Sequence, residues 1–247
     1  MGTLAGKSAI VTGGSRGIGR AIVLRLAAEG AAVAFSYLAN ERAAEAVAAQ
    51  VAASGGRARA FRADQGSLAD VSELFGHAGR WLGGLDIVVC NAASSEPIAI
   101  AEVTEERYDQ IMAVNTKGPF FAIQHAVPVL ADGGRIVAIS SLDTVLHSPG
   151  GALYSASKAA LEQIVVVAAL ELGGRGITAN IVSPGATDTE LLRSANPGET
   201  FAAEIEQTAL ARLGTPDDIA GVVAFLAGPD GGWVTGQNIR ATGGFLP

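Results

Sequence analysis

Short apolar runs alternate along the chain with longer stretches whose apolar residues recur every three or four positions. The short runs predict strands with both faces covered, and the longer stretches predict helices. The expected strands are 8–12, 32–37, 58–62, 87–90, 135–140, 178–183 and 238–241. The expected helices are 18–29, 41–54, 68–81, 105–114 with a continuation to 130, 153–172 and 216–226. This alternation predicts βαβ units and hence a parallel sheet in an α/β fold.

The length of 247 residues favours one domain, because α/β domains commonly reach this size. Hydrophobic residues make up 49% of the chain and charged residues 17%, a balance that excludes intrinsic disorder. We therefore expect a single domain over 1–247. Its least regular stretch, 186–208, contains Asn196-Pro197-Gly198, and a long irregular segment in a compact domain is typical of a substrate loop.

Charge and side-chain chemistry narrow the class of protein. A net charge of −7 without clustered positive charge argues against nucleic-acid binding. The one cysteine, Cys90, excludes an intramolecular disulfide and fits a reducing compartment. Three scattered histidines give no metal-ligand spacing, so we expect no metal. The apolar run 164–170 is too short for a membrane span, and we expect a cytoplasmic protein.

A glycine-rich segment follows the first predicted strand and opens the first predicted helix. Its glycines permit a tight turn and a close approach of the backbone to a pyrophosphate, while the helix offers unpaired N–H groups and a positive dipole end. This placement makes an ordinary glycine turn the less favoured interpretation. The segment is Thr12-Gly13-Gly14-Ser15-Arg16-Gly17-Ile18-Gly19.

This segment resembles the Thr-Gly-x-x-x-Gly-x-Gly motif of the short-chain dehydrogenase/reductase family. Further matches are Asp64, Asn91-Ala92, Asn115, Ser141, Tyr154-Ser155-Ala156-Ser157-Lys158, Pro184-Gly185 and Gly236-Gln237. The resemblance implies a doubly wound Rossmann fold with a seven-stranded parallel sheet and a nicotinamide cofactor. Three residues depart from the pattern: Gln65, Ala93 and Thr242 stand where a small aliphatic residue, glycine and aspartate are usual. The first two would alter the fit of the cofactor.

The resemblance also assigns cofactor contacts. They are Gly13, Ser15, Arg16, Gly17, Ile18, Gly19, Tyr37, Asp64, Gln65, Asn91, Ala92, Tyr154, Lys158, Pro184, Gly185, Thr187 and Thr189. An acidic residue at the end of the second strand would bind the ribose hydroxyl of NAD, but Tyr37 stands there. Arg16, and more distantly Arg42, could meet a 2′-phosphate, which favours NADP(H) over NAD(H). Glu41 argues for NAD(H) unless it opens the following helix.

Tyr154 and Lys158 lie four positions apart and so share one face of a helix. Tyrosine ordinarily titrates near pH 10, and a nearby ammonium would lower its pKa. Ser141, at the carboxyl end of the fifth strand, would hydrogen-bond the substrate oxygen. The resemblance implies that Asn115 holds a water linking Lys158 to solvent. It also implies that Tyr154 protonates a carbonyl oxygen as hydride reaches the carbon.

These residues predict an NADP(H)-dependent oxidoreductase acting on a ketone or a secondary alcohol. Two alternatives stay open: a 3-oxoacyl-(acyl carrier protein) reductase, and a nucleotide-binding regulator without catalysis. The family's carrier-docking surface is generally basic near the turn 131–135, where Arg135 is the single basic residue and Arg175 occupies a second position. The turn and the segment 232–236 resemble the branch that contains hydroxynaphthalene reductases, which indicates a cyclic or aromatic ketone.

The segment 164–170 is apolar around two helical turns, so the face that the sheet leaves open predicts an interface. The alternative is that the neighbouring helix alone covers this face. The resemblance implies dimers through these helices and tetramers through the last strand and helix, and we expect a homotetramer. Close approach of a second helix would use the small residues Ala156, Ala159, Ala160, Ala168 and Ala169.

Overall fold

The computed structural model describes residues 2–195 and 201–245. All seven strands are parallel and form one sheet with the order β3-β2-β1-β4-β5-β6-β7. The order reverses at β1, as in a doubly wound fold, so the predicted fold class is confirmed. The strands are β1 (Ser8–Val11), β2 (Ala32–Tyr37), β3 (Arg57–Arg62), β4 (Leu85–Cys90), β5 (Leu130–Ile139), β6 (Thr178–Pro184) and β7 (Asn238–Ala241).

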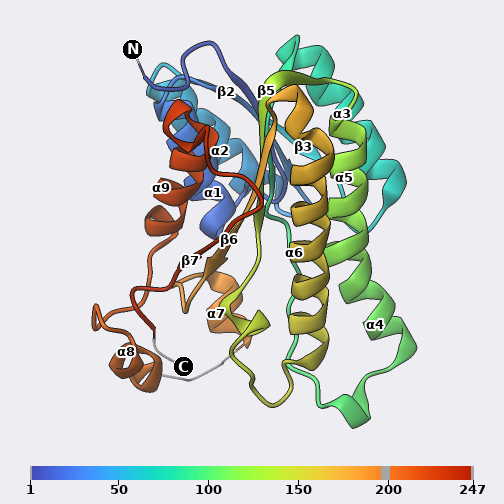
Figure 1. The fold of residues 1–247 in the computed structure, drawn as a ribbon, viewed down its shortest axis with the longest axis vertical. Helices are drawn as coiled ribbons and strands as arrows, with labels where there is room; N and C mark the ends of the chain where they lie inside the picture. Colours follow the sequence, from blue (N-terminus) through green and yellow to red (C-terminus); the bar gives the residue numbers. More distant parts are fainter. Residues whose placement is uncertain (1, 196–200, 246–247) are drawn as a thin grey trace.

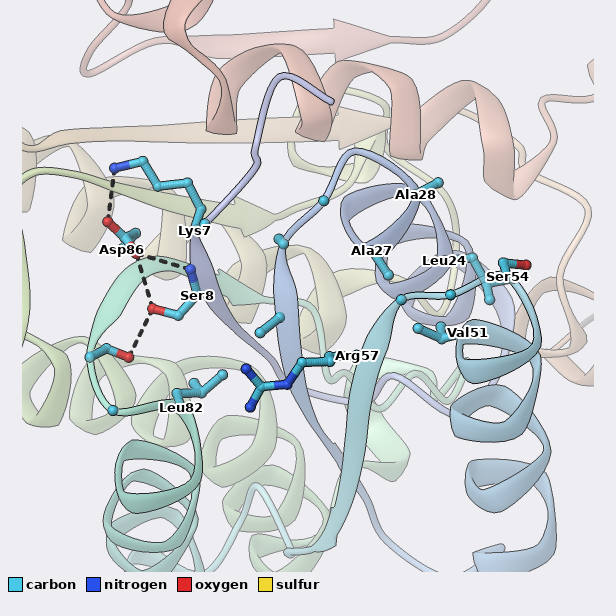
Figure 2. Close-up of a pocket in the computed structure, with 18 of the residues that line it drawn as sticks. Lys7, Ser8, Leu24, Ala27, Ala28, Val51, Ser54, Arg57, Leu82 and Asp86 are labelled. Carbon is cyan, nitrogen blue, oxygen red and sulfur yellow. Dashed lines mark hydrogen bonds and ion pairs between the residues drawn. The ribbon is translucent and has the colours of Figure 1, made fainter. Parts of the chain in front are cut away.

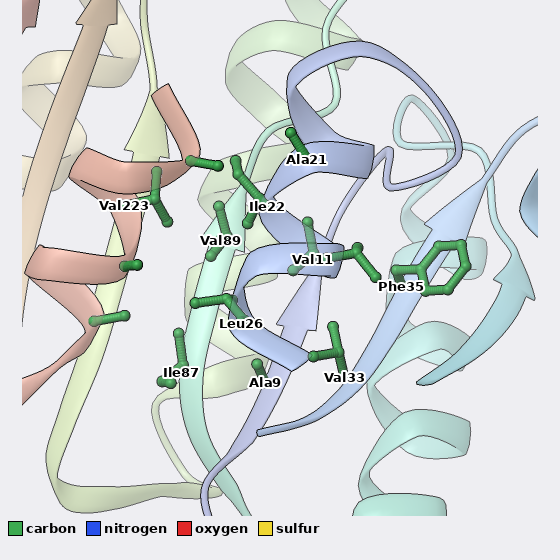
Figure 3. Close-up of a cluster of buried hydrophobic side chains, with 14 of the residues drawn as sticks. Ala9, Val11, Ala21, Ile22, Leu26, Val33, Phe35, Ile87, Val89 and Val223 are labelled. Carbon is green, nitrogen blue, oxygen red and sulfur yellow. The ribbon is translucent and has the colours of Figure 1, made fainter. Parts of the chain in front are cut away.

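Helices cover both faces of the sheet (Figure 1). One face packs against α1 (Gly17–Ala28), α2 (Glu41–Ala53) and α9 (Pro216–Ala227). The other packs against α3 (Leu68–Leu82), α5 (Gly118–Ala126) and α6 (Ala152–Leu172). Figure 3 shows the first of these cores, where Ile22 and Leu26 of α1 lie between Val223 of α9 and the strands. Coverage of both faces explains why the strands are continuous apolar runs.

The helical region before β5 differs from the prediction in two ways. The expected continuation to residue 130 is wrong, because α5 ends at Ala126 and Leu130 already pairs with Leu85 of β4. In addition, α4 (Glu105–Met112) and α5 are joined by a π-helical turn, Ala113–Lys117. Such turns interrupt α-helices mostly as single turns and occur often at functional sites.

The predicted irregular stretch 186–208 contains two short helices. They are α7 (Glu190–Ala195) and α8 (Ala202–Gln207). Thr189 precedes α7, and its hydroxyl oxygen accepts from the N–H of Leu192 at 3.2 Å. The Asn196-Pro197-Gly198 segment lies outside the described residues.

Helix α6 is the long helix of the second face. By length and composition the segment Ala152–Arg175 could cross a membrane, yet α6 lies along β6 and contains the buried Lys158. Ala168 and Ala169 are also buried, so the structure corrects the expectation that they contact a second helix. Val167 and Leu170 are the exposed large apolar residues of α6, and Ala156 and Ala159 of the predicted set are exposed as well.

Candidate active site

The residues singled out by sequence gather at the carboxyl edge of the sheet. The glycine-rich loop follows β1, Asn91 follows β4, Ser141 follows β5, and Pro184 ends β6. These strands are neighbours in the sheet, with β1 at the point where the strand order reverses. Ligands of doubly wound sheets bind in the crevice outside the carboxyl ends at such a point.

The glycine-rich loop leaves room for an anionic ligand. Arg16, the N-cap residue of α1, makes no side-chain cap bond, and the first turn of α1 contains no acid. In contrast, side chains cap α2, α3, α4 and α9. A Cβ atom on Gly17 would lie 3.6 Å from the Thr189 side chain, so the glycine keeps the space between loop and Thr189 open. Free N–H groups beside an open glycine face fit the pyrophosphate of a dinucleotide.

Two hydrogen-bonding residues hold this loop against β4. The Thr12 hydroxyl oxygen accepts from the N–H groups of Asn91 and Ala92, each at 3.0 Å. The Asn91 amide donates to the carbonyl oxygens of Thr12 and Gly13 at 2.9 and 3.0 Å. Ser36 of β2, which is not among the predicted site residues, has a hydroxyl that accepts from the Gly13 N–H at 3.0 Å. The Asn91 side chain therefore ties the start of the loop to the end of β4.

The glycines of the loop have distinct roles. Gly13 and Gly17 have φ angles of 68° and 51°, which favour glycine. A Cβ atom on Gly19 would lie 2.1 Å from the Gly13 carbonyl oxygen, so only glycine allows α1 to pack this closely on the loop. Of the other predicted loop residues, Ser15 is partly exposed, and Ile18 packs against the first core.

Two predicted cofactor contacts have buried side chains. Tyr37 packs into the first core, and its hydroxyl donates to the carboxylate of Glu41 at 3.1 Å. Gln65 packs beside Gly118 at the start of α5. The contacts of Tyr37 and Gln65 with a cofactor stay predictions. Glu41 is the first residue of α2, as the alternative interpretation expects.

The remaining predicted contacts surround the same crevice. Asp64 accepts from the Gly66 N–H at 2.8 Å and is partly exposed. Gly185 follows β6, and its N–H donates to the Ala241 carbonyl oxygen at 3.1 Å. The buried Thr187 donates to the Gly185 carbonyl oxygen at 2.9 Å. These bonds fix the segments that follow β3 and β6.

Ser141, Tyr154 and Lys158 lie together at the end of β5. The Ser141 hydroxyl is hydrogen-bonded to Tyr154 and accepts from the Asp143 N–H at 3.2 Å. Lys158 is 1% exposed, and its ammonium lies 5.9 Å from the centre of the Tyr154 ring. The ammonium donates to the carbonyl oxygen of Ile139 at 2.8 Å.

The charges around this group favour a protonated tyrosine. Burial, and the nearby Asp143 carboxylate, raise the pKa of Tyr154 above its ordinary value, while the Ser141 bond opposes the rise. Burial lowers the pKa of Lys158 to about 8. The expected lowering of the Tyr154 pKa by Lys158 is thus not produced by the protein's own charges. At neutral pH Tyr154 is accordingly a proton donor.

Asn115 lies in the π-helical turn and is fully buried. Its side-chain oxygen accepts from the Ser94 N–H at 2.8 Å, and its amide donates to the Ser94 carbonyl oxygen at 2.8 Å and to the Ser157 hydroxyl at 3.0 Å. Both amide hydrogens are therefore used. The side-chain amide group is therefore not free to donate to the water that the resemblance implies, and that water stays a prediction.

A cavity of about 770 Å³ lies at the opposite, amino-terminal edge of the sheet (Figure 2). Lys7 and Asp86 form an ion pair of 2.9 Å on its wall, and the Ser8 hydroxyl donates to the Asp86 carboxylate. Its lining includes none of the predicted site residues. The catalytic groups belong to the carboxyl edge instead.

Two carboxylates near the catalytic group are not among the predicted site residues. Glu162 follows Lys158 by one helical turn, a spacing that could have identified it. Asp143 stands two residues after Ser141 in a 3-10 turn, and no periodicity marks its approach to Tyr154.

Comparison with known proteins agrees with this geometry. A family model described as enoyl-(acyl carrier protein) reductase matches residues 13–246. A hydroxynaphthalene reductase-like protein of Metarhizium brunneum is 42% identical over 256 residues, which cover 98% of this chain and 96% of the relative.

Solved structures of related proteins are also similar to this chain in sequence and fold. The short-chain dehydrogenase/reductase of Serratia marcescens is 42% identical, with a TM-score of 0.93 over 98% of this chain and 99% of that one. The angucycline C-6 ketoreductase LanV, solved with bound NADP, is 44% identical, with a TM-score of 0.95 over 99% of this chain and 97% of that one. Fold, motifs and relatives together show that the chain belongs to the short-chain dehydrogenase/reductase family of oxidoreductases.

Proposed function

We propose that this oxidoreductase uses NADP(H) to interconvert a ketone and a secondary alcohol, with Tyr154 as the acid and base. The supporting observation is the meeting of the Ser141 and Tyr154 hydroxyls at the carboxyl end of β5. A carbonyl oxygen that accepts from both hydroxyls is polarised, and its developing negative charge is stabilised.

Each side chain has a separate task in reduction. Ser141 donates to the substrate oxygen throughout the reaction. Tyr154 gives its proton to that oxygen and is left as a phenolate, and Lys158 would bind the nicotinamide ribose of the cofactor, as the family resemblance implies. NADPH, when bound, supplies the hydride. In oxidation the same groups act in reverse, with the Tyr154 phenolate accepting the proton.

The choice of NADP(H) rests on the loop and on the end of β2. Arg16 is exposed at the start of α1, where a 2′-phosphate could reach it. β2 ends in the neutral Tyr37, and the acid that follows, Glu41, is engaged by the Tyr37 hydroxyl. The related ketoreductase LanV binds NADP, which agrees with this choice.

A cyclic or aromatic ketone is the substrate class that we favour. The relatives include a hydroxynaphthalene reductase-like protein and an angucycline ketoreductase. The two arginines of the surface that would receive an acyl carrier protein are engaged by other groups of the chain. Arg175 is paired with Asp132 at 2.8 Å and donates to the Val127 carbonyl oxygen, while Arg135 donates to the main chain of the adjacent turn.

Absorbance of NADPH, followed with a panel of three substrates, tests the proposal. The panel contains a hydroxylated bicyclic aryl ketone, a 3-oxoacyl thioester and an enoyl thioester, with Tyr154→Phe as the background. Oxidation of NADPH by the aryl ketone alone is expected. Turnover of only the enoyl thioester would reject carbonyl reduction. NADPH binding without turnover of any ketone would identify a nucleotide-binding regulator.

We also propose that the chain forms a homotetramer. Val167 and Leu170 give α6 an exposed apolar face, and Leu170 is 79% exposed. A second exposed apolar pair, Phe225 and Trp233, lies on and after α9, with Trp233 99% exposed. Two separate apolar surfaces on one subunit suit the two kinds of interface in a tetramer with two-fold axes.

A further inference from the structure

Glu162 connects two strand ends behind the catalytic group. The Ser140 hydroxyl donates to its Oε1 atom at 2.6 Å, and the Ser183 hydroxyl donates to the same oxygen at 3.4 Å. Both serines are buried, at 3% and 1% exposure. Buried hydroxyls need partners, so Glu162 is an integral acceptor of this region.

The two serines are adjacent to predicted site residues. Ser140 directly precedes Ser141, and Ser183 directly precedes Pro184. Lys158, one helical turn before Glu162, binds the carbonyl oxygen of Ile139, the residue before Ser140. One face of α6 therefore holds Ile139, the last residue of β5, and Ser140, which follows it, immediately before the serine that would contact the substrate.

Glu162 lies one helical turn after Lys158 and so on the same side of α6, where its carboxylate favours the ammonium form. Burial disfavours the ammonium form, while Cys90 of β4 and Glu162 of α6 act in the opposite direction. Burial raises the pKa of Cys90 to about 12, so its thiol is neutral at physiological pH. The nearby Tyr154 is also neutral at physiological pH, because burial and the Asp143 carboxylate raise its pKa. Glu162 is thus the charged group that supports the Lys158 ammonium within the described part of the chain.

We propose that Glu162 is a positioning residue with two effects: it aligns the ends of β5 and β6 around the site, and it keeps Lys158 positively charged at the working pH. The proposal rests on the proposed function where it concerns turnover. The effect on Lys158 belongs to the protein alone and can be measured without cofactor or substrate.

The test of the charge effect uses the small number of lysines. The chain contains three, Lys7, Lys117 and Lys158, so carbon-13 lysine labelling gives three titration curves by NMR. In the cofactor-free protein, Glu162→Gln keeps an acceptor for the serines and removes the charge. The Lys158 midpoint should fall by about one pH unit, as expected for loss of a nearby opposite charge.

A matched control is Glu171→Gln, which removes the same charge from an exposed position of α6. It should leave the Lys158 midpoint in place. An equal shift in both variants would show a general charge effect and overturn the assignment. An unchanged midpoint in Glu162→Gln would overturn it too. If Glu162→Gln fails to fold, Glu162→Asp keeps the charge and should retain the wild-type midpoint, and a fall there contradicts the proposal.

The alignment effect needs a separate variant. Ser140→Ala removes the 2.6 Å bond and leaves the Glu162 charge. We expect kcat for ketone reduction to fall several-fold, with the Lys158 midpoint unchanged. Wild-type kcat in Ser140→Ala would reject the alignment effect. A shifted midpoint in Glu162→Gln without ketone turnover in the wild type would reject the proposed function and retain the charge effect.

Discussion

Arg16 and Glu190 form an ion pair of 3.1 Å that joins the glycine-rich loop to the first turn of α7. Their side chains are 65% and 70% exposed, so solvent screens the pair and little free energy is needed to break it. A 2′-phosphate bound at Arg16, as proposed above, would compete with the Glu190 carboxylate for this guanidinium. Such an exchange would free the first turn of α7 from the loop.

The first prediction follows from that exchange. Arg16→Ala should lower kcat/KM with NADPH by about tenfold or more, the effect of one lost charge-assisted hydrogen bond. With NADH the value should change little. Glu190→Gln is the matched control, because it frees Arg16 and should leave NADPH use intact or improved. Steady-state kinetics with both cofactors decides it, and equal losses with NADPH and NADH would show that Arg16 does not recognise the 2′ position.

Tyr154→Phe should abolish proton transfer and preserve NADPH affinity. A general acid contributes about 10²–10⁴-fold to rate, and kcat should fall within that range. Tyr108→Phe is the control, since Tyr108 is an exposed residue of α4. Single-turnover kinetics should be used to confirm that chemistry limits the rate. Retention of more than about a third of the wild-type rate would remove Tyr154 from its assigned role.

Asp143→Asn should make Tyr154 a stronger acid. The Asp143 carboxylate raises the pKa of Tyr154 by opposing the phenolate, and the neutral amide removes that repulsion. Alcohol oxidation requires the phenolate and so increases as pH approaches the Tyr154 pKa from below. The pH profile of kcat/KM for oxidation should therefore move to lower pH. A profile in the same place as the wild type would show that Asp143 does not act on Tyr154.

Lys158→Met should stabilise the fold at neutral pH and abolish activity. The pKa of Lys158 is lowered to about 8 in the folded protein, against about 10.4 in an unfolded chain, so folding disfavours its charged form by about 3 kcal/mol at pH 7. Loss of the hydrogen bond to Ile139 should reduce the stability gained by the substitution by about 1 kcal/mol. The net gain should fade as pH rises from about 8 to 10, where wild-type Lys158 loses its charge.

Urea denaturation at pH 7 and pH 10 measures this difference. Lys117→Met is the control, because Lys117 is exposed and its charge is solvated. Lower stability of Lys158→Met at pH 7 would mean that the Lys158 bond outweighs its desolvation.

The assembly can be tested by light scattering. A tetramer of 24.9 kDa subunits is expected for the wild type. Leu170→Asp should yield dimers held by the second surface, and Trp233→Ser should yield dimers held by α6. Leu38→Asp, which alters an exposed apolar residue outside both surfaces, should leave the mass unchanged. A wild-type mass near 24.9 kDa would contradict both interfaces.

The strands and the glycine-rich loop were predictable because their signals are local. An apolar run between turns defines a strand, and the spacing of Gly13, Gly17 and Gly19 defines the loop. Lys158 was predictable from its spacing to Tyr154. These features depend on neighbouring residues in the chain, which the sequence displays directly.

The remaining features depend on contacts between distant segments. The burial of Tyr37 reflects packing of β2 into the first core, and Glu162 gains its role only when β5 and β6 bring Ser140 and Ser183 to α6. Asp143 approaches Tyr154 through a 3-10 turn with no sequence period. The π-helical turn likewise depends on bonds from Asn115 to Ser94 and Ser157, which lie far from it in sequence.

The π-helical turn also limits how this stretch can change in length. One residue rotates an α-helix by about 100°, so an insertion or deletion within α4 would turn its cap at Thr104 away from its present place. A deletion inside Ala113–Lys117 could instead be absorbed by conversion to an α-turn, and α4 and α5 would both persist. Asn115 would then lose its position between Ser94 and Ser157. Such a shortened protein should keep its sheet and helices, but Asn115 would no longer hydrogen-bond Ser94 and Ser157.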